Sequence, residues 1–355
     1  MPLSVGSSSS QHLDLIALSL TPFSWRRNLG EDLRAGDSAA WILDRLLRNG
    51  RLKQNGLDRP TLLSRASAAM ARAADRGLHL VAWSDASYPA ALSAIADPPP
   101  ALWVRGNLSA LTSRAVAIVG SRAGSPYALA VAERLAADLS TRGIVVVSGL
   151  ARGVDSAAHR GAVAAGGATL AVLGSGADVI YPAEHRDLAR EIETGGAIVS
   201  ELVPGTPPQK QFFPLRNRII SGLSRAVLIV EAGEKSGSLI TARCALDQGR
   251  EVLAVPGNVL SGRNRGGHGL LRDGAKIVES ADDILEELGL PSPRTRRGNE
   301  PEDPVLAGLP AGESCDLDVI AERTGLASSR LLPRLFELEL AGLIRRVGGG
   351  RFARV

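Results

Sequence analysis

The stretch Phe212–Ala242, FFPLRNRIISGLSRAVLIVEAGEKSGSLITA, decides the fold. It predicts a helix that begins with basic residues, a strand buried on both faces at Ala226–Val230, and a small-residue loop, Glu231–Ser238, that opens a second helix. Such a loop after a buried parallel strand presents unpaired N–H groups and the positive end of a helix dipole at the sheet edge. The stretch therefore predicts a site for an anion and fits a phosphate-bearing ligand best.

The surroundings of this loop are locally positive. No acidic residue lies between Glu201 and Glu231, whereas this interval contains Lys210, Arg216, Arg218 and Arg225. The whole chain of 355 residues carries a net charge of only +4 and has a pI near 9.4, so its overall charge favours polyanions weakly. The argument for phosphate binding therefore rests on the local cluster.

Short apolar runs rich in strand-forming residues recur from Leu78 onward, and most of the later ones alternate with segments long enough for one helix. They are LHLVAW (78–83), ALWVRG (101–106), AVAIVG (115–120), IVVVSG (144–149), TLAVLG (169–174), AIVSEL (197–202), AVLIVEA (226–232), EVLAVPG (251–257) and AKIVES (275–280). This alternation predicts an α/β fold, an extended Rossmann-like and mostly parallel sheet covered by helices, with ligands bound at the carboxyl ends of its strands.

The predicted strand ends carry small residues, which let a backbone approach a ligand closely. Glycine-bearing turns follow five of the strands: Gly120–Arg122, Ser148–Gly153, Gly174–Gly176, Glu231–Gly233 and Pro256–Gly257. Arg122 and Arg152 place a charge in two of these turns. Because the turns are expected at neighbouring strand ends, they predict a single binding crevice.

Two common nucleotide-binding motifs do not fit. The first turn, GSRAGS, departs from G-x-G-x-x-G, and Ser148 occupies the place of the expected acid, which disfavours NAD. The loop AGEKSGSL has Lys235 before its last glycine, unlike a Walker A loop, which disfavours NTP hydrolysis. We expect no cofactor and no metal, since Cys244 and Cys315 make neither a disulfide framework nor a metal cluster.

Few residues are arranged for catalysis. Asp155 and His159 lie four residues apart in DSAAH, and we expect them to make structural hydrogen bonds. Glu201 and Glu231 are the two carboxylates at strand ends. A nucleotide-processing hydrolase of the phosphoribohydrolase type would need such an acid, so this alternative stays open beside phosphate binding without catalysis.

Additional basic and aromatic residues are expected at the same sheet edge. The stretch from Val252 to Arg272 meets no acid and contains a Gly/Asn-rich loop with Arg263 and Arg265, which we expect to close over the crevice. Only 3% of the residues are aromatic, and the candidates near the crevice include Tyr181 and the pair Phe212 and Phe213. In this pair we expect one ring to stack on a base and the other to anchor the helix.

The chain divides into three predicted domains. Residues 1–77 predict a small helical (SAM-like) domain, residues 78–290 the core, and residues 291–304 a linker. Residues 305–355 predict two helices and a hairpin, which is the pattern of a winged helix, and Pro333 predicts a late start or a kink of the second helix. Bases and acids are nearly balanced there, so duplex binding by a transcription regulator and docking of a protein partner both stay open.

The expected location is the cytoplasm. Nothing in the sequence resembles a signal peptide or a membrane-spanning helix. The two cysteines are expected to be free thiols in a reducing compartment.

The motif series closely resembles the DNA-processing protein A family, also called DprA or Smf. The motifs are GSR (120–122), SGLARGVDSAAH (148–159), YP (181–182), FPLRNRIISGLS (213–224), EAGEKSGSLITA (231–242), AVPG (254–257) and GGHGLLRDGA (266–275). They occur in the family's order over about residues 78–289. The resemblance implies a Rossmann-like core that forms a homodimer, binds and protects single-stranded DNA, and loads a RecA-type recombinase during natural transformation, with no known catalysis.

The resemblance also implies a basic DNA pocket at Arg122 and at the triplet Arg216–Arg218, joined by the loop Ser236–Ser238. The candidate DNA-binding residues are Gly120, Ser121, Arg122, Gly149, Arg152, Gly153, Tyr181, Lys210, Phe212, Phe213, Arg216, Asn217, Arg218, Lys235, Ser236, Gly237, Ser238, Thr241, Arg263 and Arg265. Ala183 stands where some members carry a lysine, so we expect Arg186, Lys210 and Lys235 to contribute more of the affinity.

Overall fold

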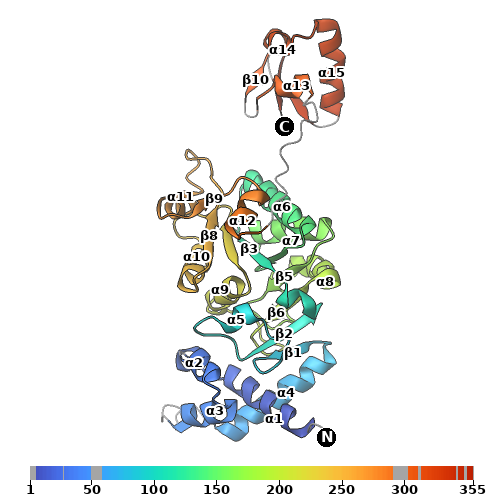
Figure 1. Ribbon diagram of the computed structural model, residues 1–355. Helices are drawn as coiled ribbons and strands as arrows, with labels where there is room; N and C mark the ends of the chain where they lie inside the picture. Colours follow the sequence, from blue (N-terminus) through green and yellow to red (C-terminus); the bar gives the residue numbers. More distant parts are fainter. Residues whose placement is uncertain are drawn as a thin grey trace. The chain divides into compact units, whose positions relative to one another are not determined.

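The computed structural model describes residues 5–26, 28–48, 58–290, 303–310, 313–340, 343–347 and 350–354. These residues belong to two compact units, Met1–Pro291 and Ser292–Val355 (Figure 1). The predicted helical domain at residues 1–77 lies within the first unit. Most of the predicted linker, residues 291–302, lies outside the described residues, and a helix already begins at Pro304.

A nine-stranded sheet forms the centre of the first unit. Its strands are β1 (His79–Ala82), β2 (Ala101–Gly106), β3 (Ala115–Val119), β4 (Val145–Ser148), β5 (Thr169–Val172), β6 (Ala197–Ser200), β7 (Ala226–Ile229), β8 (Glu251–Ala254) and β9 (Lys276–Ile277). Their order is β1-β2-β6-β5-β4-β3-β7-β8-β9, and only the β1–β2 and β2–β6 pairs are antiparallel. Each predicted strand is therefore present, and the mostly parallel Rossmann-like sheet is confirmed.

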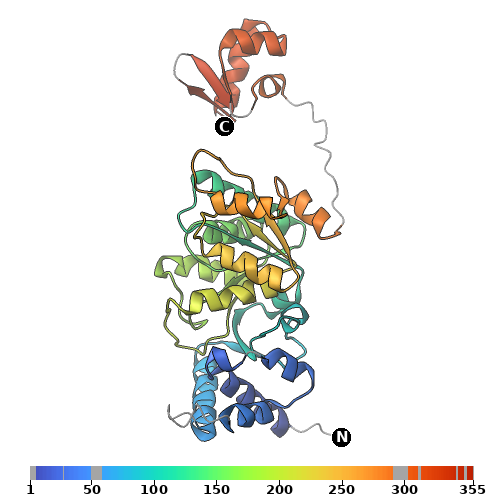
Figure 2. The same cartoon turned by 90° about the vertical axis from the view of Figure 1, so that its left-hand side faces the viewer.

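Helices cover both faces of this sheet (Figures 1 and 2). One face is packed by α6 (Pro126–Thr141), α7 (Val154–Ala164), α8 (Arg186–Gly195) and α12 (Ala281–Glu287). The other is packed by α5 (Ala90–Ser93), α9 (Phe212–Gly222), α10 (Ser238–Asp247) and α11 (Arg265–Arg272). Strand β3 explains this sandwich, since Val116 and Ile118 face one layer, whereas Ala117 and Val119 face the other.

The strand order reverses beside β3. From β3 the chain builds β4, β5 and β6 in one direction, and it then crosses to build β7, β8 and β9 in the other. Strands β3 and β7 are neighbours and parallel, so their carboxyl ends open side by side. In an open α/β sheet this reversal is where the loops diverge and leave a crevice for a ligand.

The N-terminal helices pack on the β1–β2 end of the sheet. They are α1 (Val5–Ser19), α2 (Leu29–Arg34), α3 (Ala39–Arg48) and α4 (Arg59–Asp75), with a short 3₁₀ turn, η1, at Phe23–Trp25. Helix α2 was not expected, because its six residues are too few to show helical periodicity. Trp103 of β2 is fully buried in the hydrophobic cluster that these helices share with the sheet and α8.

The second unit combines α13 (Pro304–Ala307), α14 (Leu317–Thr324) and α15 (Ser328–Leu340) with the strands β10 (Ser314–Cys315), β11 (Ile344–Val347) and β12 (Arg351–Arg354). Helix α14 ends at Gly325, which adopts φ +68°, a left-handed conformation that glycine adopts without strain. Strand β10 was not expected, because two residues are too few for a strand pattern. Of the two alternatives predicted from Pro333, the late start is not seen, since α15 begins at Ser328 and contains Pro333, and the kink stays a prediction.

No helix among the described residues combines the length and the apolar character needed to cross a membrane.

We predict that Trp103→Ala lowers the free energy of unfolding by about 3–5 kcal/mol, because it leaves a cavity where the N-terminal helices meet the sheet. A urea titration followed by circular dichroism measures this change. Trp41→Ala is the matched control, since Trp41 is 45% exposed and its loss should change the stability by less than about 0.5 kcal/mol. Equal effects of the two substitutions would contradict this account of the core.

Candidate nucleic-acid interface

A cleft of about 850 Å³ opens at the carboxyl ends of β3 and β7, at the reversal point of the sheet. Of the predicted DNA-binding residues, the structure brings together thirteen along this cleft: Gly120, Ser121, Arg122, Tyr181, Lys210, Phe213, Arg216, Asn217, Lys235, Ser236, Gly237, Ser238 and Thr241. They come from the loops after β3, β5, β6 and β7 and from the N-terminal halves of α9 and α10. The predicted crevice is therefore present, but of the five glycine-bearing turns only those after β3, β4 and β7 contribute lining residues.

The rim of the cleft carries uncompensated positive charge. Arg122, Lys210 and Lys235 are exposed, and their side chains form no ion pair or hydrogen bond with the part of the chain that the structure describes. Each is therefore available to an external anion. Phosphate groups would interact with these three cations without first displacing a carboxylate.

An aromatic pair lies under one of these cations. The rings of Tyr181 and Phe213 have centroids 5.6 Å apart and are tilted by 42°. The guanidinium carbon of Arg122 lies 5.3 Å from the centroid of Phe213. Phe213 lines the cleft whereas Phe212 does not, so Phe213 is the member of the predicted pair that is placed to meet a base.

The N-terminus of α10 forms one wall. The hydroxyls of Ser236 and Ser238 lie 2.8 Å apart, and Gly237 precedes the first helical residue. Asn217 holds this loop from α9, since its Nδ2 donates to the carbonyl of Gly237 at 3.4 Å. A helix N-terminus with hydroxyls beside it can donate hydrogen bonds to an oxyanion.

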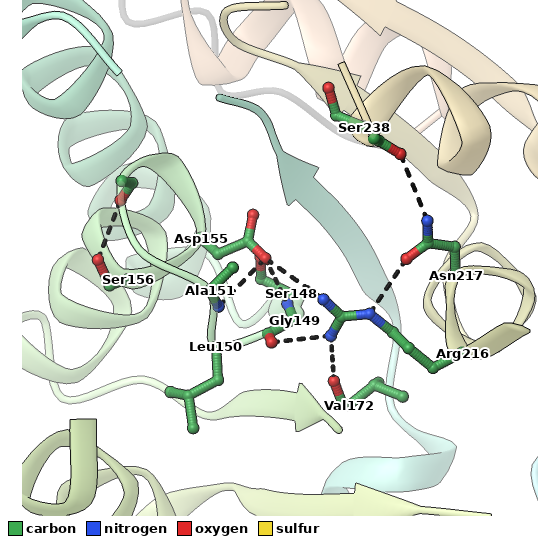
Figure 3. A network of polar contacts seen from close by, with 12 residues as sticks. Ser148, Gly149, Leu150, Ala151, Asp155, Ser156, Val172, Arg216, Asn217 and Ser238 are labelled. Carbon is green, nitrogen blue, oxygen red and sulfur yellow. Dashed lines mark hydrogen bonds and ion pairs between the residues drawn. The ribbon is translucent and has the colours of Figure 1, made fainter. Parts of the chain in front are cut away.

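Arg216 forms the floor of the cleft (Figure 3). Its guanidinium donates to the carbonyls of Gly149, at 2.8 Å, and of Val172, and it forms an ion pair with Asp155 at 3.9 Å. Asp155 in turn accepts from the backbone N–H of Gly149 at 3.1 Å. Burial lowers the pKa of Arg216 to about 10 and raises the pKa of Asp155, which Arg216 opposes. The charge of Arg216 is therefore largely compensated inside the protein, by Asp155 and by backbone carbonyls.

The expectation that Arg218 joins the same cradle is wrong. Two residues along a helix correspond to a turn of about 200°, so Arg216 and Arg218 leave α9 on opposite sides. Arg218 forms ion pairs with Glu201 and, at 3.2 Å, with Asp97, and it lines a separate cavity. Its charge is locked against carboxylates and does not reach the cleft.

Arg152 lines a small pocket beside the cleft rather than the cleft itself, together with Gly149. Its guanidinium makes a two-pronged contact with Glu184, with Nε–Oε1 and Nη2–Oε2 distances of 2.5 and 3.0 Å. Gly153 lies next to it with φ +77°, and a side chain there would meet the carbonyls of Ser121 and Arg122. Gly153 therefore lets the turns after β3 and β4 come together, while the charge of Arg152 is already paired.

The two arginines of the loop after β8 do not line the cleft. Arg263 donates from Nη1 to the carbonyl of Ala123 at 3.2 Å, so the loop lies against the turn after β3. Arg265 is exposed at the start of α11. The loop therefore borders the cleft, and its predicted closure over a ligand stays a prediction.

Comparisons with known proteins agree with this architecture. Residues 79–289 match the family model of DNA recombination-mediator protein A, and residues 290–350 match the DprA winged helix domain. This chain belongs to the DNA recombination-mediator protein A family. The resemblance inferred from the motifs is thereby confirmed, as is the winged-helix domain.

Relatives support the same assignment. Protein Smf of Escherichia coli is 44% identical over 285 residues, which cover 77% of this chain and 76% of that protein. The solved structure of DprA from Streptococcus pneumoniae matches with a TM-score of 0.66 and 34% identity, covering 81% of this chain and 99% of that one. DprA from Helicobacter pylori, whose structure was described for its single-stranded DNA binding mode, matches with a TM-score of 0.54 and 30% identity, covering 60% and 97%.

The strand-end carboxylates of this DprA-family chain are engaged in structural contacts. Glu231 accepts hydrogen bonds from the N–H and hydroxyl of Ser125, at 3.1 and 2.6 Å, and so fixes the start of α6. Glu201 is bound to Arg218. Neither lines the cleft, so the geometry gives the hydrolase alternative no catalytic acid from this pair.

His159 also has a structural contact. It is fully buried, and its Nδ1 lies 2.7 Å from the hydroxyl of Thr169, which donates to the carbonyl of Val146 at 2.7 Å. This contact ties α7 to β4 and β5, as expected from the sequence. Burial, with smaller contributions from nearby His185 and Arg216, lowers the pKa of His159 to about 3.

Sequence reasoning missed several residues of the site. Asp155 lies in the cleft floor as the partner of Arg216, and Ile220 and Ile240 give the cleft an apolar lining. The two isoleucines have no sequence signal, because helical core positions look the same. Within the described ranges, no group of three or more His, Cys, Asp or Glu side chains is placed to hold a metal ion.

We predict that Gly149→Ala destabilises the core by about 3–5 kcal/mol, because a methyl group there would collide with the guanidinium of Arg216 and break its pair with Asp155. Urea unfolding measures the loss. Gly269→Ala is the control, since a methyl group on that α11 glycine meets nothing within 4 Å. A Gly149→Ala protein as stable as the control would mean that Arg216 is not held as described.

A second prediction concerns pH. Folding lowers the pKa of His159. The imidazole is therefore protonated below about pH 6.5 in the unfolded chain but only below about pH 3 in the folded chain. His159→Asn should therefore remove a loss of about 1.4 kcal/mol of stability per pH unit between pH 6 and pH 4. Urea titrations at several pH values test this, with His79→Asn, an exposed position on β1, as the control. Parallel stability profiles of His159→Asn and wild type would contradict the buried neutral state.

Proposed function

We propose that this protein binds single-stranded DNA in the cleft at the ends of β3 and β7, protects the incoming strand and loads a RecA-type recombinase onto it during natural transformation. The observation that carries the proposal is the rim of three cations, Arg122, Lys210 and Lys235, which have no ion-pair partner among the described residues and lie around a helix N-terminus. Phosphate contacts of this kind supply most of the affinity of sequence-neutral binders. The single-stranded DNA binding of the Helicobacter pylori relative supports the same choice.

Base contacts in this proposal come from the aromatic pair. Tyr181 is 43% exposed, and Phe213 lies between it and Arg122. A base placed against Tyr181 would gain stacking energy of about 1–3 kcal/mol, while its phosphate stays within reach of Arg122. Stacking of this kind does not distinguish sequences, because every base has a π face.

The partners in this proposal are a RecA-type recombinase and a second copy of the chain. The winged helix is a candidate for a partner contact rather than for duplex DNA, because α15 exposes Leu332 and Phe336, four residues apart on the helix. Arg334 on the same helix is paired with Asp303 and Glu337. We further propose that the protein acts in the cytoplasm, in keeping with its two free thiols.

We propose no catalytic activity. The hydrolase alternative would need an acid in the cleft, and the only carboxylate among the described lining residues is Asp155, which is held by Arg216 and by backbone N–H groups. A carboxylate engaged in this way is poorly placed to act as a general base.

The proposal predicts that Arg122→Ala and Lys235→Ala each weaken binding of an oligo-dT by about tenfold and make the negative slope of log K against log salt shallower by about 0.7. Fluorescence anisotropy at several salt concentrations measures both quantities. Arg134→Ala is the matched control, because Arg134 is an exposed arginine in the middle of α6. It should bind as wild type does.

Wild-type affinity in both cleft variants would contradict the proposal. Arg218→Ala distinguishes a loss of phosphate contacts from a loss of stability, since it removes a buried charge that does not line the cleft. Its salt slope should equal that of the wild type even where the fold is weakened. Loading is tested by recombinase filament formation on the oligonucleotide, which Arg122→Ala should reduce in parallel with binding.

A further inference from the structure

A second cavity, of about 240 Å³, lies on the opposite side of α9 from the cleft. It is lined by Phe23, Ser24 and Arg26 from η1 and its C-terminal end, by Asp97 and Pro98 from the loop before β2, and by Leu215 and Arg218 from α9. None of these seven residues lines the cleft. The cavity is therefore a separate feature that DNA binding in the cleft does not use.

Arg26 is the unusual residue of this cavity. It is only 6% exposed, yet among the described residues its side chain has no hydrogen-bond or ion-pair partner. Its guanidinium carbon lies 4.0 Å from the centroid of the Phe23 ring. The face of the ring attracts the cation but cannot accept a strong hydrogen bond from it. Burying a charge without a direct partner is costly, and burial lowers the pKa of Arg26 to about 10, a shift that nearby Glu201 and Asp97 oppose and Arg218 adds to.

Arg218 adds a second group of unused donors. Its Nη1 is buried and has no hydrogen-bond partner, although Glu201 and Asp97 neutralise its charge. The side chain of Asp97 is 51% exposed, so it can turn toward water. Two guanidiniums and the Ser24 hydroxyl would then surround the cavity, which is more donors than the two oxygens of a carboxylate would use.

We propose that this cavity binds a phosphate group, held by Arg26 and Arg218, with Asp97 as the internal competitor for Arg218. The phosphate is either the free ion or the phosphate of a mononucleotide. The inference is independent of DNA binding in the cleft. Because the cavity joins the N-terminal helices to α9, a bound phosphate stabilises the packing of those helices on the core.

Thermal unfolding in the presence of sodium phosphate tests the site, with sodium chloride of equal ionic strength as the reference. At a phosphate concentration tenfold above Kd, the midpoint of the wild type should rise by about 3 °C or more. Arg26→Met should show no rise, and it should be at least as stable as the wild type without phosphate, because it removes an unpaired buried charge. Asp97→Asn should bind phosphate more tightly, since it removes one of the two carboxylates paired with Arg218.

Arg122→Ala is the matched control, because it removes a cation of the cleft and leaves this cavity intact. It should keep the full response to phosphate. The proposal is overturned if phosphate acts no more strongly than chloride, if Arg26→Met keeps the response, or if Arg122→Ala loses it. An equal response to acetate would also overturn the assignment to phosphate.

Thymidine 5′-monophosphate, titrated into Arg122→Ala, distinguishes the two sources. Tighter binding than inorganic phosphate assigns the site to a nucleotide, and equal or weaker binding assigns it to the free ion. Oligo-dT binding by Arg26→Met should stay at the wild-type level. Arg122→Ala therefore tests DNA binding in the cleft, whereas Arg26→Met tests phosphate binding in the cavity, so the two proposals can fail independently.

Discussion

The buried guanidinium of Arg216 is the interaction on which the cleft depends. It joins α9 to the carboxyl ends of β4 and β5 through the carbonyls of Gly149 and Val172, and to α7 through Asp155 (Figure 3). Removing either partner would leave a charge in a nearly dry environment, which is far more costly than breaking a surface pair. The floor of the cleft is therefore fixed by internal electrostatics before any ligand arrives.

Because the floor is neutralised internally, attraction for a polyanion comes from the rim. Arg122, Lys210 and Lys235 are exposed and unpaired among the described residues, whereas Arg152 is paired with Glu184 and Arg218 with Glu201. Long, exposed cationic side chains can adjust to a sugar-phosphate chain that follows different paths. The rigid floor fixes the position of the crevice around which these side chains lie. A rigid floor with flexible cations at the rim suits the sequence-neutral DNA binding that we propose for the cleft.

Helix α9 connects two sites of different character. Arg216 points to the cleft floor, and Arg218 points to the cavity beneath the N-terminal helices. The same helix thus lies between the cleft, which we propose binds DNA, and a smaller cavity with a buried arginine, Arg26, that has no side-chain partner among the described residues. The connection between α1 and α2, formed by η1 and Arg26, lines that cavity, whereas the helices themselves pack over Trp103 and the sheet edge.

The sequence alone determined the strands, the parallel sheet, the crevice at the glycine-bearing turns and the family. These follow from local patterns, because apolar runs, glycines at strand ends and clusters of charge can all be recognised within short segments of the sequence. Only the tertiary structure decided which arginines are free, because pairing depends on carboxylates far away in sequence. Glu201 takes Arg218, Glu184 takes Arg152 and Asp155 takes Arg216, over separations of 17, 32 and more residues. The helical geometry of α9 adds to this, since Arg216 and Arg218, the first and last members of one triplet, lie on opposite sides of the helix.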